Sequence, residues 1–283
     1  MTPKQARLTV LIIFGLFIFW RLCYPPVVNV DKWNTAIGIS IELIGGIVLL
    51  GLLSFLQNVH RLWFYFQTTV LLRNEEIRLS IAYLYRIKVD DKYLLVKNTR
   101  RELFQPVGGV YKTLPGSEKI FRELDIRPDR HINTELGIAK GDLRVHVPGK
   151  HVLEFLDWFD SKQDRETSPW REFCEELLTT GILNHTKAFR YIDYHFRGTI
   201  RTPIIELDTG GKGMFQFDIF DLEINDEQRP VLEALLAEGD KPDYIWASSY
   251  LIDRLGHDEG TRTRVYEIAK HTKWAHNMKW SKG

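Results

Sequence analysis

The sequence contains few cysteines. Only Cys23 and Cys174 occur among its 283 residues. Small secreted domains that cannot build a large core are usually dense in disulfides, and two distant cysteines cannot supply such a framework. The low count therefore argues against a secreted disulfide scaffold and favours a reducing compartment for the folded part of the chain.

The sequence also lacks an excess of charge of either sign. It has 38 Lys and Arg residues and 37 Asp and Glu residues, so its formal net charge is +1. Proteins that bind nucleic acids generally show a strong basic excess, so we expect no nucleic-acid partner. No internal repeat or low-complexity tract is visible in the sequence, and its length predicts one or two globular domains.

Two long apolar segments are present near the N-terminus. Residues 8–24 contain Arg21 as their one charged residue, and residues 36–55 contain Glu42 as theirs. A helix of 20 residues is about 30 Å long, which is the thickness of the apolar core of a bilayer. The sequence therefore predicts a transmembrane hairpin in residues 1–60. A cleaved signal peptide is the alternative for the first segment, although no small-residue cleavage site follows it.

The basic residues that flank the predicted hairpin indicate its orientation. Four basic residues flank the two outer ends of the hairpin, namely Lys4, Arg7, Arg61 and Arg73. Two lie near the connection between its helices, namely Arg21 and Lys32. Cytoplasmic loops carry the excess of Lys and Arg, so we expect a two-pass protein with both termini in the cytoplasm. For Glu42 two interpretations stay open: a functional group inside the membrane, or a carboxyl that is protonated or lies near the headgroups.

The composition changes after the hairpin. Residues 61–76 begin with aromatic residues typical of a membrane boundary and end in the polar "RNEE", so we interpret them as an interfacial linker. From residue 77, alternating apolar and polar residues predict strands. Helical spacing follows at 150–162, 169–180, 226–239 and 259–280. This order of elements predicts an α/β or α+β domain over 77–283.

The segment "SPWREFCEELL" combines an arginine with three glutamates. On a helix, Glu172, Glu175 and Glu176 fall at positions i, i+3 and i+4 and share one face. Clustered carboxylate oxygens suit Mg²⁺ or Mn²⁺ better than zinc. A solvated acidic helix face is the alternative interpretation, because glutamate-rich helix surfaces are common.

The same segment resembles the NUDIX hydrolase family. The family's box contains R-E-U-x-E-E, with U aliphatic or aromatic, and it is matched position for position by Arg171, Glu172, Phe173, Glu175 and Glu176. Upstream, "ELFQPVGG" is similar to the family's approach to its glycine pair, here Gly108 and Gly109. The resemblance covers roughly 77–280 and implies an α/β/α sandwich. An insertion at about 113–163 separates this glycine pair from Glu166, where the family has a five-residue spacer.

The resemblance also implies roles for these residues. Glu172 would be a metal ligand and a base, Glu175 and Glu176 would be further ligands of Mg²⁺ or Mn²⁺, and Arg171 would orient Glu172. Gly108 and Gly109 would contact the nucleotide or a metal ion through their backbone. Whether the altered box still hydrolyses phosphoric anhydrides stays open.

The insertion and the two apolar segments are similar to one branch of the family, the SMODS-associated NUDIX proteins of bacterial CBASS antiviral systems. This resemblance implies an effector in the bacterial inner membrane that responds to a cyclic nucleotide, disrupts the lipid bilayer and causes abortive infection. Homo-oligomers packed through the hairpin would fit that role. The alternative is a Mg-dependent pyrophosphohydrolase of nucleoside diphosphate derivatives, for which the hairpin is only an anchor.

Three weaker patterns complete the analysis. The glycine-rich "DTGGKGMF" at 208–215 lacks the spacing of a P-loop and predicts a hairpin turn. His271 and His276 are five residues apart, which misses the spacing of paired zinc ligands on a helix. A basic, aromatic strand could line a nucleotide pocket or only alternate between two faces, and this stays open for Arg190, Arg197 and Arg201.

Overall fold

The computed structural model describes residues 37, 40, 43–48, 50–51, 58–59, 61–98, 101–130, 140–183 and 187–281. The chain divides into two compact units, 1–65 and 66–283, which are described separately. Every described residue of the first unit is helical. The predicted domain boundaries at 60/61 and 76/77 stay predictions.

The predicted localisation needs correction. Crossing a bilayer requires about 20 consecutive apolar residues in a helix. Among the residues that the structure describes, no helix is both long and apolar enough to do so. This finding contradicts the prediction of a two-pass protein in the inner membrane. The predicted span 8–24, half of 36–55 and Glu42 lie outside the described residues.

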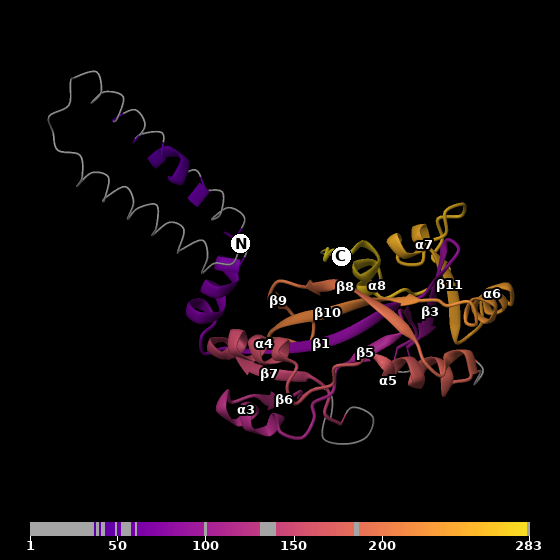
Figure 1. The fold of residues 1–283 in the computed structure, drawn as a ribbon, viewed down its shortest axis with the longest axis horizontal. Coiled ribbons are helices and arrows are strands. Elements are labelled where there is room, and N and C mark those ends of the chain that lie inside the picture. The colour runs from indigo at the N-terminus through magenta and orange to yellow at the C-terminus, as the bar shows by residue number, and fades with distance from the viewer. Residues whose placement is uncertain are drawn as a thin grey trace. The chain divides into compact units, whose positions relative to one another are not determined.

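The second unit is built around a seven-stranded mixed sheet (Figure 1). Its strands run in the order β6-β7-β1-β10-β8; β5 also pairs with β1, and β9 with β10. β1 and β10 are parallel, and the other pairs are antiparallel. The strands are β1 (Glu76–Arg86), β5 (Gly108–Val110), β6 (Arg127–Pro128), β7 (Arg144–Pro148), β8 (Asp193–Arg201), β9 (Ile205–Glu206) and β10 (Lys212–Glu223).

β1 is the central strand of this sheet. Seven consecutive residues from Leu79 to Tyr85 are buried. A strand covered on both faces has this continuous burial, whereas a half-exposed strand alternates. β1 therefore carries side chains into the packed layers on both sides of the sheet.

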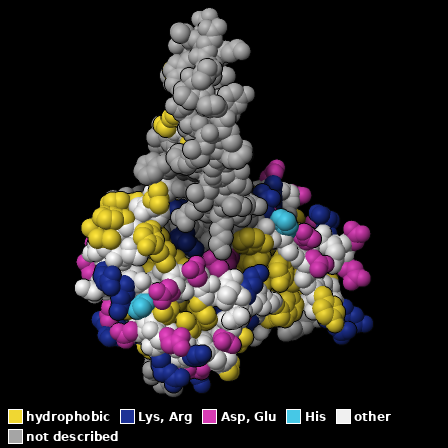
Figure 2. Space-filling view, turned by 60° about the vertical axis from the view of Figure 1, so that its left-hand side comes forward, with side chains coloured by type: hydrophobic (Ala, Val, Ile, Leu, Met, Phe, Trp, Pro, Cys, Tyr) yellow, Lys and Arg dark blue, Asp and Glu magenta, His cyan; other side chains and the backbone are white. Residues whose placement is uncertain are grey.

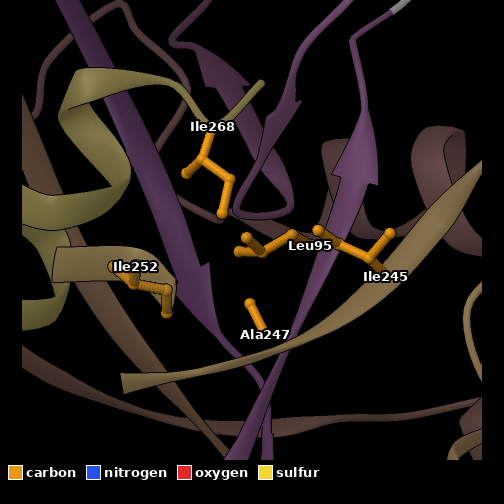
Figure 3. Close-up of a cluster of buried hydrophobic side chains, with 5 residues drawn as sticks. All are labelled: Leu95, Ile245, Ala247, Ile252 and Ile268. Carbon is orange, nitrogen blue, oxygen red and sulfur yellow. The ribbon is translucent and has the colours of Figure 1, made fainter. Parts of the chain in front are cut away.

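A smaller sheet of four strands packs its own core. Its strands are β2 (Lys88–Val89), β3 (Lys92–Lys97), β4 (Phe104–Gln105) and β11 (Tyr244–Ser248), in the order β11-β3-β2 with β4 beside β3. A turn at Asp90 and Asp91 joins β2 to β3, and Asp90 has the positive φ of 50° that such a tight turn uses. Figure 3 shows the core of this region, where Leu95 of β3 meets Ile245 and Ala247 of β11 together with Ile252 and Ile268.

Helices surround the two sheets. In Figure 1, α4 lies beside β7 and α6 lies beside β11. The helices are α3 (Ser117–Glu123), α4 (Val152–Ser161), α5 (Trp170–Phe173), α6 (Arg229–Ala237), α7 (Ser249–Asp253) and α8 (Lys270–Asn277). Short 3-10 turns occur at Gly149–His151 and Lys187–Phe189, and π-helical turns at Gln67–Leu71 and Cys174–Leu178.

The mixed α and β architecture confirms the predicted fold class at that level; the finer α/β/α layering stays a prediction. The helix predicted over 259–280 is shorter in the structure, because α8 begins only at Lys270. Ala269, which precedes it, has an extended backbone. On the face shown in Figure 2, Lys and Arg side chains lie among Asp and Glu side chains, as the near-zero net charge leads one to expect.

Candidate functional site

The two glycines of β5 allow a close approach of three segments. Gly109 pairs with Tyr83 of β1, and Gly108 pairs with Leu84. A Cβ atom at Gly108 would overlap the backbone of Tyr83, and one at Gly109 would overlap the carboxylate of Glu172. Gly108 also has a φ of 148°, which side chains rarely tolerate. Glycine is therefore required at both positions for the Glu172 side chain to lie directly against β5.

The helix that carries the glutamates is anchored by its apolar side. Phe173 and Leu177 are fully buried. The Phe173 ring stacks on Trp170 at 5.6 Å between ring centroids and meets the edge of Tyr85 at 5.8 Å. At Cys174 the helix changes to a π-turn, closed by a hydrogen bond from Thr179 N to Cys174 O. Such wide turns are frequent at functional sites.

Arg171 connects the acidic side chains. Its guanidinium donates to Glu166 from Nε at 3.1 Å and from Nη2 at 3.2 Å. Nη1 donates to Glu172 Oε1 at 2.5 Å and to Glu175 Oε2 at 3.3 Å. A further bond from Nη2 to the carbonyl of Val110 fixes the guanidinium against β5. Arg171 is thus held by five bonds, one of which engages Glu172; that it orients Glu172 for function stays a prediction.

Glu176 and Glu172 are the carboxylates of the site that lie beside the glycines, and both are largely buried. Glu176 Oε2 accepts a hydrogen bond from Gly108 N at 2.8 Å. Burial, together with the neighbouring Glu172 and Glu175, raises the pKa of Glu176 to about 8 against the opposing effects of the Gly108 bond and of Arg171. Burial likewise raises the pKa of Glu172, although Arg171 opposes this shift. Both groups therefore hold protons more strongly than an exposed glutamate does.

Glu175 has a different position. Its side chain is 46% exposed and contacts Arg171 at the solvent edge of the cluster. The structure therefore separates the three glutamates of the predicted face into two buried groups beside the glycines and one group at the rim.

Two contributing residues were not among the predicted site residues. Glu166 accepts both bonds from one edge of Arg171, and Tyr83 OH lies 3.4 Å from Glu172 N and 3.5 Å from Glu166 Oε1. Burial raises the pKa of Tyr83. The spacing Ile81, Tyr83, Tyr85 on one face of a strand was a signal for Tyr83, but only the long-range contact shows what it faces.

The donor set fits a hard divalent cation in its chemistry. Four carboxylates, of Glu166, Glu172, Glu175 and Glu176, surround one guanidinium, so the cluster is short of positive charge when they are ionised. Among the described residues, however, no three His, Cys, Asp or Glu side chains gather closely enough to hold a metal ion by themselves. The site thus offers the buried pair Glu172 and Glu176, with backbone and ligand oxygens left to complete a coordination shell.

The weaker candidates take ordinary structural places. Residues 207–211 form the predicted hairpin turn between β9 and β10, with a bond from Leu207 N to Gly211 O. His271 stacks on Phe217, whereas His276 meets the edge of Tyr93, so the two imidazoles face different partners. Of the arginines, Arg197 contacts Asp221 and Arg201 donates to Gln216.

Comparison with known families identifies the second unit. A model of the SMODS-associated NUDIX domain matches residues 76–276, from the start of β1 almost to the end of α8. The match includes Gly108, Gly109 and the whole acidic cluster. A search of the curated proteins finds no match to the chain.

Proposed function

The chain belongs to the SMODS-associated NUDIX family, and on that premise we propose that it is an effector of a bacterial CBASS antiviral system. Its ligand is a nucleotide derivative, and a cyclic nucleotide is the first candidate. The phosphates of this ligand bind at the acidic cluster around Arg171. Abortive infection is the cellular outcome of this binding.

The observation that carries the proposal is the buried pair of carboxylates beside the glycines. Glu172 and Glu176 have raised pKa values because they are buried with too little positive charge. A divalent cation is the natural partner for such a pair, and Mg²⁺ commonly binds through one or two carboxylates together with substrate phosphates. When bound, Mg²⁺ would neutralise charge on the phosphate oxygens.

The residues of the chain divide the remaining tasks. Arg171 holds Glu172 in one orientation, with Oε1 engaged at 2.5 Å. The bond from Gly108 N holds the Glu176 carboxylate against β5. Glu175, at the rim, is placed to meet a ligand or a metal-bound water from the solvent side.

Hydrolysis of a phosphoric anhydride is the second candidate function, and the raised pKa of Glu172 favours it. A carboxyl whose pKa lies nearer to neutrality is a better proton acceptor from water than an exposed glutamate. The substrates would be nucleoside diphosphate derivatives. In that case Glu172 accepts the proton, and Arg171 positions it.

Titration of the full-length chain with Mn²⁺, followed by electron paramagnetic resonance, tests the metal site. We expect the double variant Glu172→Gln, Glu176→Gln to bind Mn²⁺ at least about 100-fold more weakly, since both carboxylate ligands become neutral. Glu233→Gln on α6, which removes an exposed glutamate from an ion pair with Arg229, is the matched control. Equal Mn²⁺ affinity in the double variant and in this control would refute the proposal.

Assays with a panel of nucleoside diphosphate derivatives then separate the two functions. Turnover that disappears in the double variant supports the hydrolase. Metal-dependent nucleotide binding without turnover, together with protection against phage that the same variant loses, supports the effector.

A further inference from the structure

A second cleft lies at the other end of β1. It has a volume of about 390 Å³, within the range typical of small-molecule sites. Its walls come from β1, β7, the residue Arg130 after β6 and the turn between β9 and β10. The lining includes Arg78, Arg130, His146 and Lys212, with Glu76 as its acidic member.

The sheet brings these basic groups together. Arg78 of β1 and His146 of β7 are directly paired across the antiparallel ladder, so their side chains share one face. On the other edge of β1, Ile77 pairs with Lys212 at the start of β10, so the Lys212 side chain lies on the face opposite to Arg78, where it pairs with Glu75. Residues far apart in the sequence therefore converge on one cleft.

Arg78 is rigidly held in this cleft. Its Nε donates to both oxygens of Asp129, at 3.2 and 3.1 Å, and Nη2 donates to Oδ2 at 2.5 Å. The Asp129 side chain is fully buried, and that of Arg78 is 13% exposed. In the part of the chain that the structure describes, no hydrogen bond involves Nη1 of Arg78, so one edge of the fixed guanidinium remains to bind an anion.

His146 contributes a buried nitrogen. Within the described residues, its Nε2 is shielded from solvent and has no hydrogen-bond partner; Asp129 Oδ1 lies 3.8 Å away. Buried polar atoms without partners are rare, and they often mark a missing water or ligand. Burial lowers the pKa of His146, and the charged groups around it are Asp129, Arg130, Glu76 and Arg78.

The glycine turn forms the open side of the cleft. Gly210 and Gly211 have φ values of 87° and 78°, and a Cβ at either position would meet no atom within 4 Å. The turn therefore leaves room for a ligand to approach its backbone. Beside it, Lys212 Nζ pairs with Glu75 Oε2 at 2.5 Å.

We propose that this cleft is a second ligand site, which binds a phosphate-bearing molecule of nucleotide size without a metal ion. The lining brings the guanidinium groups of Arg78 and Arg130 and the shielded ring nitrogen of His146 together beside the glycine turn, with Asp129 and Glu76 as the ion-pair partners of the two arginines. The site is distinct from that cluster: Arg78 and Tyr83 are five residues apart on β1, which corresponds to about 16 Å along a strand and to opposite faces of the sheet.

Calorimetric titration of the full-length chain with inorganic pyrophosphate in the presence of EDTA tests this proposal. We expect the wild type to bind pyrophosphate. The double variant Arg130→Ala, His146→Gln should bind it at least about tenfold more weakly, because one charge-assisted contact and one hydrogen-bond donor are removed. Arg130→Ala alone, at a side chain that is 60% exposed, should give a smaller loss of affinity and leave the fold intact. Arg229→Ala is the matched control, because this arginine is 52% exposed and also pairs with a glutamate.

The results separate this site from the acidic one. Binding in EDTA that persists in Glu172→Gln, Glu176→Gln supports the second site, and its loss in that variant would overturn it. No heat from millimolar pyrophosphate with the wild type, or the same loss in Arg229→Ala as in the cleft variant, would also overturn it. In NMR spectra, pyrophosphate should raise the pKa of His146, and an unchanged titration would count against direct contact.

Discussion

The two ends of β1 compensate their charges in opposite ways. At the end near Arg78, a fully buried aspartate is matched by an arginine and further basic groups surround them. At the end near Tyr83, a single arginine serves several glutamates, and two of these are buried. The first arrangement balances its buried charge within the chain, and we propose that it accepts an anion. The acidic cluster is short of positive charge until a cation binds. Burial of charged groups alone therefore does not determine whether a site binds an anion or a cation.

The largest expected effect comes from breaking the matched pair. Arg78→Ala removes the arginine that pairs with the buried Asp129 carboxylate, and we expect a loss of about 3–5 kcal/mol in the free energy of unfolding. Urea denaturation followed by circular dichroism measures this loss. Adding Asp129→Asn should restore part of the stability, because the uncompensated charge is then gone. If the double variant were as unstable as Arg78→Ala, the loss would not come from the buried charge of Asp129.

The unmatched site should show itself in the pH dependence of stability. The pKa of Glu176 is raised to about 8 in the folded chain, so between its unfolded value and pH 8 the folded state binds the extra proton. Stability in EDTA therefore falls as the pH rises from 5 to 8, by up to a few kcal/mol, since each pKa unit corresponds to about 1.4 kcal/mol. Thermal unfolding at several pH values measures this. Glu176→Gln should flatten the profile, and Mg²⁺ should restore stability at pH 8; a profile unaffected by Glu176→Gln would assign the effect elsewhere.

A methyl group at the glycine pair sharpens the comparison further. Gly109→Ala places a Cβ in the Glu172 carboxylate, so β5 or the helix must shift. We expect a loss of about 1–3 kcal/mol, typical of overpacking, and a strong reduction of Mn²⁺ affinity. Pyrophosphate binding in EDTA should be unchanged in this variant. If the affinities for Mn²⁺ and for pyrophosphate fell together, the sites at the two ends of β1 would not be independent.

The smallest effect is expected at the turn of the basic cleft. Gly210→Ala meets no neighbouring atom, so its cost is limited to the positive φ, about 1 kcal/mol. Its effect on Tm should be correspondingly small, and Mn²⁺ binding should not change. A loss as large as that of Gly109→Ala would mean that the turn is packed more tightly than the structure shows.

Local patterns were sufficient for part of this molecule. Alternation predicted strands from residue 77, where β1 lies, and the resemblance to the NUDIX box implied that Arg171 lies beside Glu172, which it contacts. The short strand β11 and the helices α3 and α7 were missed, because "YIWAS" is an apolar run without alternation and the two helices have only seven and five residues. The helix expected over 259–269 does not form, although charged residues there gave an apparent helical pattern.

The contacts that define the sites were beyond local prediction. The bonds from Arg171 to Val110 and from Arg78 to Asp129 join residues 61 and 51 positions apart. No periodicity encodes such pairs. The same holds for the π-turn at Cys174 and for Glu175, which lies at the rim although the helical spacing placed it on one face with Glu172 and Glu176.

The place of Asp129 has a consequence for the history of the chain. The segment 113–163, predicted as an insertion, supplies both β6 and β7 to the main sheet and holds the counter-ion of Arg78. If an ancestor acquired this segment as a dispensable loop, it could not later delete it. The deletion would remove two strands from the main sheet and would take away the aspartate that pairs with the Arg78 guanidinium. Among descendants, positions 78 and 129 should then change together or not at all.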